Sequence, residues 1–101
     1  MRNPKPVEKR NFKGLGFVPV VHLQGIGPVP AVPASSLRKG DITIWNYGGQ
    51  ERVLDIETSP SGKTAVFRIE SIGHGTLWDR RMNLSRYVAV DHTTFKKRHK
   101  A

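Results

Sequence analysis

Two aromatic residues on one short segment have the type and spacing of a binding surface. Thr43, Trp45 and Tyr47 alternate in the sequence, so an extended strand would carry all three on one face. An exposed tryptophan beside an exposed tyrosine can stack nucleic-acid bases. The stripe also suits a barrel core, because only one of the two faces, Ile42 with Ile44 or Trp45 with Tyr47, can lie fully inside. We assign Ile42 and Ile44 to the barrel and Trp45 and Tyr47 to binding.

Three arginines follow near the end of the predicted domain. Arg80, Arg81 and Arg86 are close enough in sequence to clamp a phosphate group. The alternative is that Asp79 and Asp91 pair with them inside the protein. The predicted contact face comprises Trp45, Tyr47, Arg68, Arg80, Arg81 and Arg86.

The last residues form a basic run that also suits a polyanion. Lys96, Lys97, Arg98 and Lys100 are predicted to neutralise phosphates and release counterions, which gives salt-dependent affinity without sequence preference. The alternative is a terminus that only keeps the protein soluble.

Charge is unevenly distributed along the 101 residues, whose formal net charge is +9. Residues 1–13 carry five bases and one acid, and residues 14–37 carry no charge. Residues 38–91 carry eight bases and seven acids, whereas residues 92–101 carry four bases and no acid. The predicted folded part is therefore nearly neutral and both predicted tails are basic, which favours a polyanionic partner.

No motif for catalysis is recognisable. The chain has no cysteine, which excludes disulfides, thiolate metal sites and thiol nucleophiles. The four histidines, His22, His74, His92 and His99, lack the paired spacing of a zinc site. No nucleophile lies next to a base and an orienting partner in a known pattern. We therefore expect a non-catalytic protein without cofactor, bound metal or small-molecule substrate.

Composition divides the chain into four segments. Residues 1–13 are predicted to be a basic disordered tail, because they offer too little apolar surface to offset chain entropy. Residues 14–32 form a Gly/Pro-rich extended arm, in which residues 17–23 are at best an edge strand because proline removes a ladder donor; a non-specific linker is the alternative. Residues 33–91 are predicted to form a β-barrel domain, which the apolar segment before Pro33 is expected to help complete. Residues 92–101 are predicted to be a basic C-terminal tail.

Short strands joined by Gly and Pro turns make up the predicted domain. Residues 50–58 alternate at period two, with Arg52, Leu54 and Ile56 on one face and Val53 on the other. Residues 64–72 are rich in β-branched and aromatic residues, with Ala65, Phe67 and Ile69 on one face and Val66, Arg68 and Glu70 on the other. Shorter strands are expected at residues 41–47, 78–82 and 87–90. This pattern predicts an all-β fold, a small SH3-like barrel or roll of four to six short antiparallel strands with disordered or extended basic tails.

Several local patterns resemble known families. Gly40-Asp41-Ile42-Thr43-Ile44 is similar to the start of KOW-type strands in ribosomal proteins and transcription elongation factors. Leu37-Arg38-Lys39-Gly40-Asp41 resembles the Leu-x-x-Gly-Asp of intein and Hedgehog-type autoprocessing domains, whose nucleophilic Cys and Thr-x-x-His block are absent here, so autoprocessing is excluded. The longest likeness, over roughly residues 33 to 90, is to short uncharacterised proteins of actinobacterial phages and mobile elements. It is carried by Pro33-Ala34-Ser35, Leu37, Gly40-Asp41, Trp45-Asn46-Tyr47-Gly48, Arg80-Arg81-Met82 and Arg86-Tyr87-Val88.

Two functional hypotheses follow from these observations. The first is a non-catalytic phage-type small β-barrel that binds DNA or RNA. The second is a protein-interaction module, a virion component or an inhibitor of a host enzyme, in which residues 17–23 add an edge strand to a phage or host protein. No segment has the length and apolarity of a membrane span or a secretory signal, so we expect a protein of the host cytoplasm or of the virion.

Overall fold

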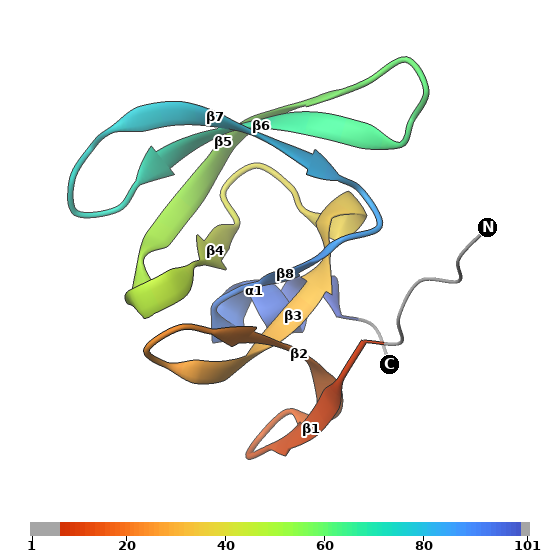
Figure 1. Ribbon diagram of the computed structural model, residues 1–101, viewed down its shortest axis with the longest axis vertical. Coiled ribbons are helices and arrows are strands. Elements are labelled where there is room, and N and C mark those ends of the chain that lie inside the picture. Colours follow the sequence, from red (N-terminus) through yellow and green to blue (C-terminus); the bar gives the residue numbers. More distant parts are fainter. Residues whose placement is uncertain (1–6, 100–101) are drawn as a thin grey trace.

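The computed structural model describes residues 7–99, which form two antiparallel four-stranded sheets and one short α-helix (Figure 1). The first sheet has the order β1-β2-β3-β8 and comprises β1 (Lys9–Phe12), β2 (Gly16–Leu23), β3 (Gly27–Pro33) and β8 (Tyr87–Ala89). The second has the order β4-β5-β6-β7 and comprises β4 (Ile42–Ile44), β5 (Gln50–Thr58), β6 (Thr64–Ser71) and β7 (Leu77–Asn83). The predicted all-β class is confirmed, although the described chain has eight strands where four to six were predicted.

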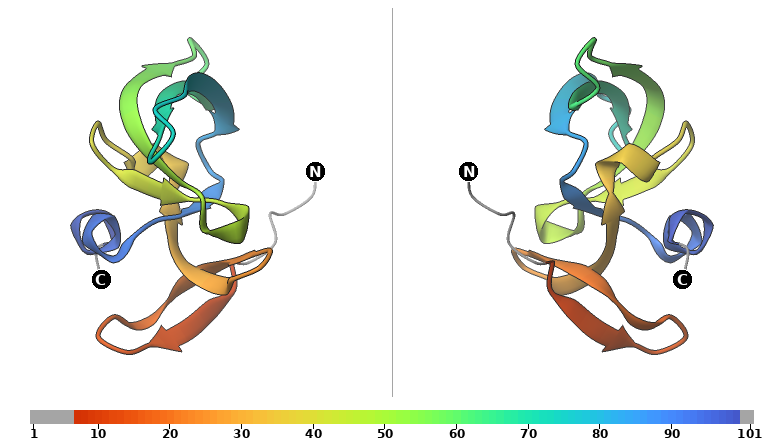
Figure 2. Two further views of the ribbon diagram at one scale, coloured as in Figure 1. Left: turned by 90° about the vertical axis from the view of Figure 1, so that its left-hand side faces the viewer. Right: turned by 90° about the vertical axis from the view of Figure 1, so that its right-hand side faces the viewer.

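The two sheets meet but do not close into a complete barrel. A single bridge between Thr43 and Val90 joins β4 to the end of β8. β1 and β7 remain as the outer strands of their sheets. Figure 2 shows the second sheet curling over the top of the molecule while the β1 and β2 hairpin forms the opposite end.

The hydrophobic core lies between the sheets and is built mainly from β-branched and aromatic side chains. Phe67 and Val32 are completely inaccessible to solvent, and Ile69 and Val53 are at 1 % exposure. The predicted division of β6 into two faces is therefore confirmed, and the face with Ala65, Phe67 and Ile69 is the inner one. The predicted faces of β5 are wrong in part, because the register shifts between Val53 and Asp55, and this bulge lets both Val53 and Ile56 contact the core.

The predicted N-terminal tail and arm are folded where the structure describes them. Residues 1–6 of the predicted disordered tail lie outside the described part, but Lys9–Phe12 form β1, with Phe12 packed against the core. Residues 17–23 are not an edge strand, since β2 pairs with β1 through its first half and with β3 through its second. β3 in turn pairs with β8, far away in sequence. Composition alone does not reveal that this arm is folded, because β3 is buried by pairing with β8, which is distant in sequence.

The assignment of inner and outer faces on β4 is reversed. Thr43 is at 2 % exposure, whereas Ile42 and Ile44 are only half-buried. The strand ends at Ile44, and Asn46–Gly48 form a 3-10 turn in which Tyr47 has φ 63°. Trp45 and Tyr47 therefore do not share a strand face. Thr43 is buried because it lies at the junction of the sheets, where its hydroxyl accepts a hydrogen bond from Trp45 Nε1 at 2.9 Å.

The predicted C-terminal tail is largely a helix. α1 (His92–Arg98) is capped by Asp91, whose side chain accepts a hydrogen bond from the Thr94 amide. A prediction from composition alone does not take such an N-cap into account. Phe95 is at 2 % exposure and Thr94 Oγ1 accepts from the Ile42 amide at 3.0 Å. These contacts anchor the helix to the sheets. No helix within residues 7–99 has the length and apolar character required to cross a membrane.

Candidate nucleic-acid interface

Arg80 is the centre of the candidate interface and lies on the inner face of β7. Arg80 is paired across from Phe67, and Trp78 from Ile69, and both β6 residues are buried. Met82, two positions after Arg80, is also buried at 4 % exposure. Because strand residues alternate between faces, Trp78, Arg80 and Met82 share the inner side, and they become more exposed toward the start of β7.

A buried carboxylate holds this arginine in place. Glu51 of β5 is at 4 % exposure and lies across from Thr43 of β4. Arg80 donates through Nε to Glu51 Oε1 at 2.8 Å and through Nη2 to Oε2 at 3.0 Å. Trp78 Nε1 donates to the same Oε2 at 3.1 Å. One carboxylate therefore orients a guanidinium and an indole at once.

Trp45 stacks on this arginine. The Arg80 Cζ lies 4.0 Å from the Trp45 ring centroid and 5.3 Å from that of Trp78. Such a cation above an indole face is attracted by the ring quadrupole. The half-buried Trp45 ring is thus already in contact with a guanidinium, whereas Trp78 keeps 48 % of its surface exposed. Trp78 is the more accessible aromatic platform of the two.

Arg86 completes the group, which we call the tryptophan–arginine cluster: Trp45, Trp78, Arg80 and Arg86 around Glu51. Arg86 lies in the turn between β7 and β8, where its carbonyl accepts from the Ala34 amide at 2.7 Å. Its Cζ is 5.5 Å from the Trp45 ring centroid and the side chain is exposed. Within residues 7–99 it has no carboxylate partner at ion-pair distance. Arg86 therefore offers a guanidinium to an external anion.

A groove opens beside this cluster, between the turn that precedes β7 and the turn that follows β4. It combines two indole rings, an imidazole, an amide and a hydroxyl, a mixture suited to a flat heteroaromatic ligand. Its lining comprises Trp45, Gly49, Gln50, Glu51, Ser71, His74, Trp78 and Arg80.

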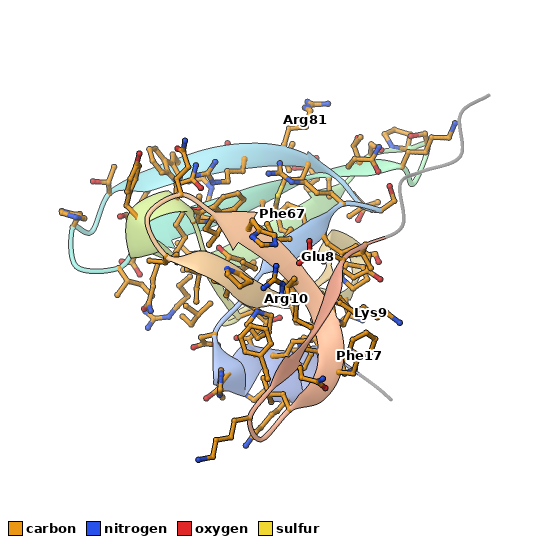
Figure 3. The ribbon with its side chains drawn as sticks, turned by 60° about the horizontal axis from the view of Figure 1, so that its bottom comes forward. Glu8, Lys9, Arg10, Phe17, Phe67 and Arg81 are labelled. Carbon is orange, nitrogen blue, oxygen red and sulfur yellow. The ribbon has the colours of Figure 1, made fainter. Side chains whose placement is uncertain are left out.

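The structure does not bring all the predicted contact residues together. Arg68 and Arg81 lie on the outer face of the second sheet, opposite the cluster; Figure 3 shows Arg81 pointing away from the body of the protein. Arg68 Nε is 3.6 Å from Asp79 on the adjacent strand. Two more exposed ion pairs, Lys39 with Asp55 and Arg52 with Glu70, leave this face electrically mixed.

Three other predicted residues lie elsewhere in the fold. Tyr47 is 75 % exposed, and its ring lies over Gly25 in the turn between β2 and β3. The Tyr47 amide donates a hydrogen bond to the carbonyl of the neighbouring Gln24 at 2.7 Å. Lys96 and Lys97 are exposed on α1. The predicted contact residue Lys100 lies outside the described part of the chain.

Arg98 has a structural partner. It donates through Nε and Nη2 to the buried Asp41 carboxylate at 2.7 and 2.9 Å. Its hydrogen bond to Asp41 is the main cause that raises the pKa of Arg98 above its ordinary value. Arg98 thus serves to dock α1 and is already neutralised.

Sequence reasoning missed Trp78, Glu51 and His74, as well as the groove residues Gly49, Gln50 and Ser71. Trp78 had a usable signal, since counting back in twos from Met82 through Arg80 places it on the inner face. Glu51 had none, because nothing local distinguishes a buried acid from an exposed one at the start of a strand. His74, between two glycines, reads as an ordinary loop residue, and only the fold brings it to the groove.

Neither a known protein family nor a metal-binding cluster assigns a role to this site. No protein-family model matches the chain, and no curated protein matches its sequence. Among residues 7–99, no group of three or more His, Asp or Glu side chains is placed to hold a metal ion.

Proposed function

We propose that this protein is a non-catalytic nucleic-acid-binding module whose contact surface is centred on the tryptophan–arginine cluster. Phosphates pair with Arg86 and with other free cations, while the aromatic groove contacts bases.

The observation that carries the proposal is that unpaired basic side chains outnumber unpaired carboxylates. Within residues 7–99, six basic side chains lie within 4.0 Å of a carboxylate: Arg10, Lys39, Arg52, Arg68, Arg80 and Arg98. The other eight in this range do not, namely Lys9, Lys13, Arg38, Lys63, Arg81, Arg86, Lys96 and Lys97. Over the same range, only Glu57 and Asp91 lack a basic partner. This surplus favours phosphate binding, with release of counterions.

Two of the free cations, Lys63 and Arg86, lie on neighbouring turns. The Leu84 amide donates to the Lys63 carbonyl at 2.8 Å, which brings the turn between β5 and β6 beside the turn that carries Arg86. Lys63, Leu84 and Ser85 also line a common depression. A nucleic-acid strand that leaves the aromatic groove past Arg86 would meet Lys63 next.

The test is a fluorescence-anisotropy titration of labelled DNA and RNA oligonucleotides at about 50 mM salt. We expect binding by the full chain and a loss of about fivefold to tenfold in Arg86→Ala, the size of one charge-assisted contact. Arg81→Ala is the matched control, because it removes a free guanidinium from the opposite face. Undetectable binding to both nucleic acids would overturn the proposal, and equal losses in the two variants would remove the cluster from it.

A protein-interaction module is the second candidate, and the open edge of β1 together with the adjacent Phe17 favours it. β1 has a partner strand on one side only, and Phe17, across from Asn11, is 63 % exposed. Figure 3 shows Phe17 pointing away from this hairpin. A partner strand would add at β1, because residues 17–23 already pair with β1 up to residue 19 and with β3 from residue 20 onward. Retention of a stoichiometric host protein after nuclease treatment, lost in Phe17→Ser, would support this function.

The source and location of the protein belong to the same proposal. The likeness of residues 33 to 90 to short proteins of actinobacterial phages and mobile elements favours a phage-type origin. Such a protein would act in the host cytoplasm or within the virion.

A further inference from the structure

We infer that the groove beside Trp78 is a nucleobase slot, and that the protein therefore prefers single-stranded over double-stranded nucleic acid. This inference rests on the proposed function and names the ligand class of the same site. It moves base stacking from Trp45 and Tyr47, where the sequence placed it, to Trp78.

Trp78 has the exposure and the rigidity that a stacking platform needs. Nearly half of its surface, 48 %, is open to solvent. Its Nε1 is fixed by the buried Glu51 carboxylate at 3.1 Å, and the Arg80 guanidinium lies 5.3 Å from its ring centroid. The indole orientation is set before a ligand arrives, so binding loses little side-chain entropy.

The rest of the groove lining carries groups that suit a base. His74 lies between Gly73 and Gly75, both at positive φ (93° and 69°), in the turn between β6 and β7. It lines the groove with Trp78, so a flat ring entering there meets an imidazole as well as an indole. Gln50 and Ser71 contribute an amide and a hydroxyl to the lining, which can hydrogen-bond the edge of a base.

Trp45 does not fill this role, because Arg80 lies 4.0 Å from its ring centroid. Trp45 links the slot to a phosphate site instead. Contacts run from Trp78 to Arg80, from Arg80 to Trp45, and from Trp45 to Arg86, 5.5 Å from the Trp45 centroid. A base in the slot and a phosphate on Arg86 would belong to one strand.

The geometry discriminates between strand states. A base can stack on Trp78 in the groove only if it is unstacked from its neighbours and unpaired, which a single strand allows at little cost. A duplex keeps its base faces covered and would reach only the exposed cations. Duplex binding would then lack the stacking contribution.

The experiment compares a 12-residue oligothymidylate with a 12-base-pair duplex at about 50 mM salt. We expect at least tenfold tighter binding of the single strand, reduced about tenfold by Trp78→Ala because base stacking is lost. Leu77→Ala is the matched control: Leu77 is 54 % exposed, next to Trp78 but on the other face. It should bind both ligands like the parent protein.

Intrinsic fluorescence keeps the inference testable if Trp78→Ala fails to fold. In Trp45→Phe, which leaves Trp78 as the only tryptophan, saturating oligothymidylate should quench the emission strongly. In Trp78→Phe, which leaves Trp45, the change should be small. Equal affinity for single strand and duplex, or quenching confined to Trp45, would overturn the slot while leaving the proposed function standing. Failure of both ligands to bind would overturn both.

Discussion

At the scale of single residues, the buried carboxylate of Glu51 organises the candidate site. It accepts from both Arg80 and Trp78, and its side chain is only 6 % exposed. A carboxylate in such a place is tolerated only while it is paired, because the cost of removing it from water is large. The Arg80–Glu51 pair therefore carries no net charge, and its role is to position the two indoles.

Arg80→Met should leave Glu51 buried without its cation. We expect a loss of about 2 to 4 kcal/mol in the free energy of unfolding, which is shifted toward the low end of the range for wholly buried pairs because the Arg80 side chain is 33 % exposed. The control is Arg68→Met, which breaks an exposed pair with Asp79 and should cost less than about 1 kcal/mol. Urea unfolding of both variants measures the difference. Similar losses would contradict the assignment of Glu51 as the organising group.

Tyr47 owes its position to a glycine that is distant in sequence. A Cβ at Gly25 would lie 2.7 Å from Tyr47 Cδ1, whereas a Cβ at Gly27 would meet nothing within 4 Å. Both glycines have nearly the same positive φ, 82° and 81°, so alanine strains the backbone equally at either position.

Gly25→Ala should therefore destabilise the protein by about 1 kcal/mol more than Gly27→Ala, through the displaced tyrosine ring. The extra loss should vanish when Tyr47→Ala is present in both backgrounds, as a double-mutant cycle requires. Thermal unfolding of the five variants provides the values. An excess loss that persists without the ring would show that Tyr47 is not its cause.

At the scale of elements, α1 combines two roles that the sequence merged into one basic tail. Its buried side, with Phe95 and Thr94, attaches the helix to the sheets, and Arg98 adds the ion pair with Asp41. Its exposed side carries Lys96 and Lys97. Docking and phosphate binding thus belong to different residues of the same helix.

Arg98→Met should lower the free energy of unfolding by about 2 to 4 kcal/mol, because Asp41 is then buried without its cation. The salt dependence of nucleic-acid binding should stay the same. The paired substitution Lys96→Met and Lys97→Met should do the reverse, with stability changed by less than about 0.5 kcal/mol and a shallower salt dependence. Urea unfolding and anisotropy titrations separate the two roles. A shallower slope in Arg98→Met would contradict this division.

β1 shows how a polar segment is folded by its partners. Glu8, just before the strand, lies 2.8 Å from His22 Nε2 and 2.6 Å from Arg10 Nε. The hydrogen bond with His22, and after it the one with Arg10, lowers the pKa of the Glu8 carboxyl. Figure 3 shows Glu8 and Arg10 on the same side of the hairpin. The contact with His22 joins residues 14 positions apart, beyond the reach of a composition argument.

Local patterns predicted the elements that local patterns determine. The period-two alternation gave β6 and grouped Ala65, Phe67 and Ile69 on one face, and the glycine and proline turns gave most strand limits. The β5 faces were wrong because a bulge has no reliable local signature, and Thr43 was placed outside because its burial depends on Val90, distant in sequence. Of the site, Arg80, Arg86 and Trp45 were predicted, whereas Glu51 and His74 needed the fold.

At the scale of the whole molecule, the outer face of the second sheet has mixed charge, and the free Arg86 lies with the cluster on the other side. The outer surface of β5, β6 and β7 carries matched pairs such as Arg68 with Asp79. The tryptophan–arginine cluster lies on the opposite side of the same sheet, with Arg86 free of any carboxylate partner among residues 7–99. Affinity for a polyanion should therefore come from a minority of the 17 Lys and Arg side chains.

The most direct test of nucleic-acid binding is the slope of log K against log salt concentration, measured with the full chain and a single-stranded oligonucleotide from about 50 to 200 mM salt. Each phosphate neutralised contributes about −0.7 to the slope for a single strand. The proposed function predicts detectable binding at the lowest salt and a slope steeper than about −2, which corresponds to three or more phosphate contacts. No binding at about 50 mM salt, or a slope near zero, would contradict it.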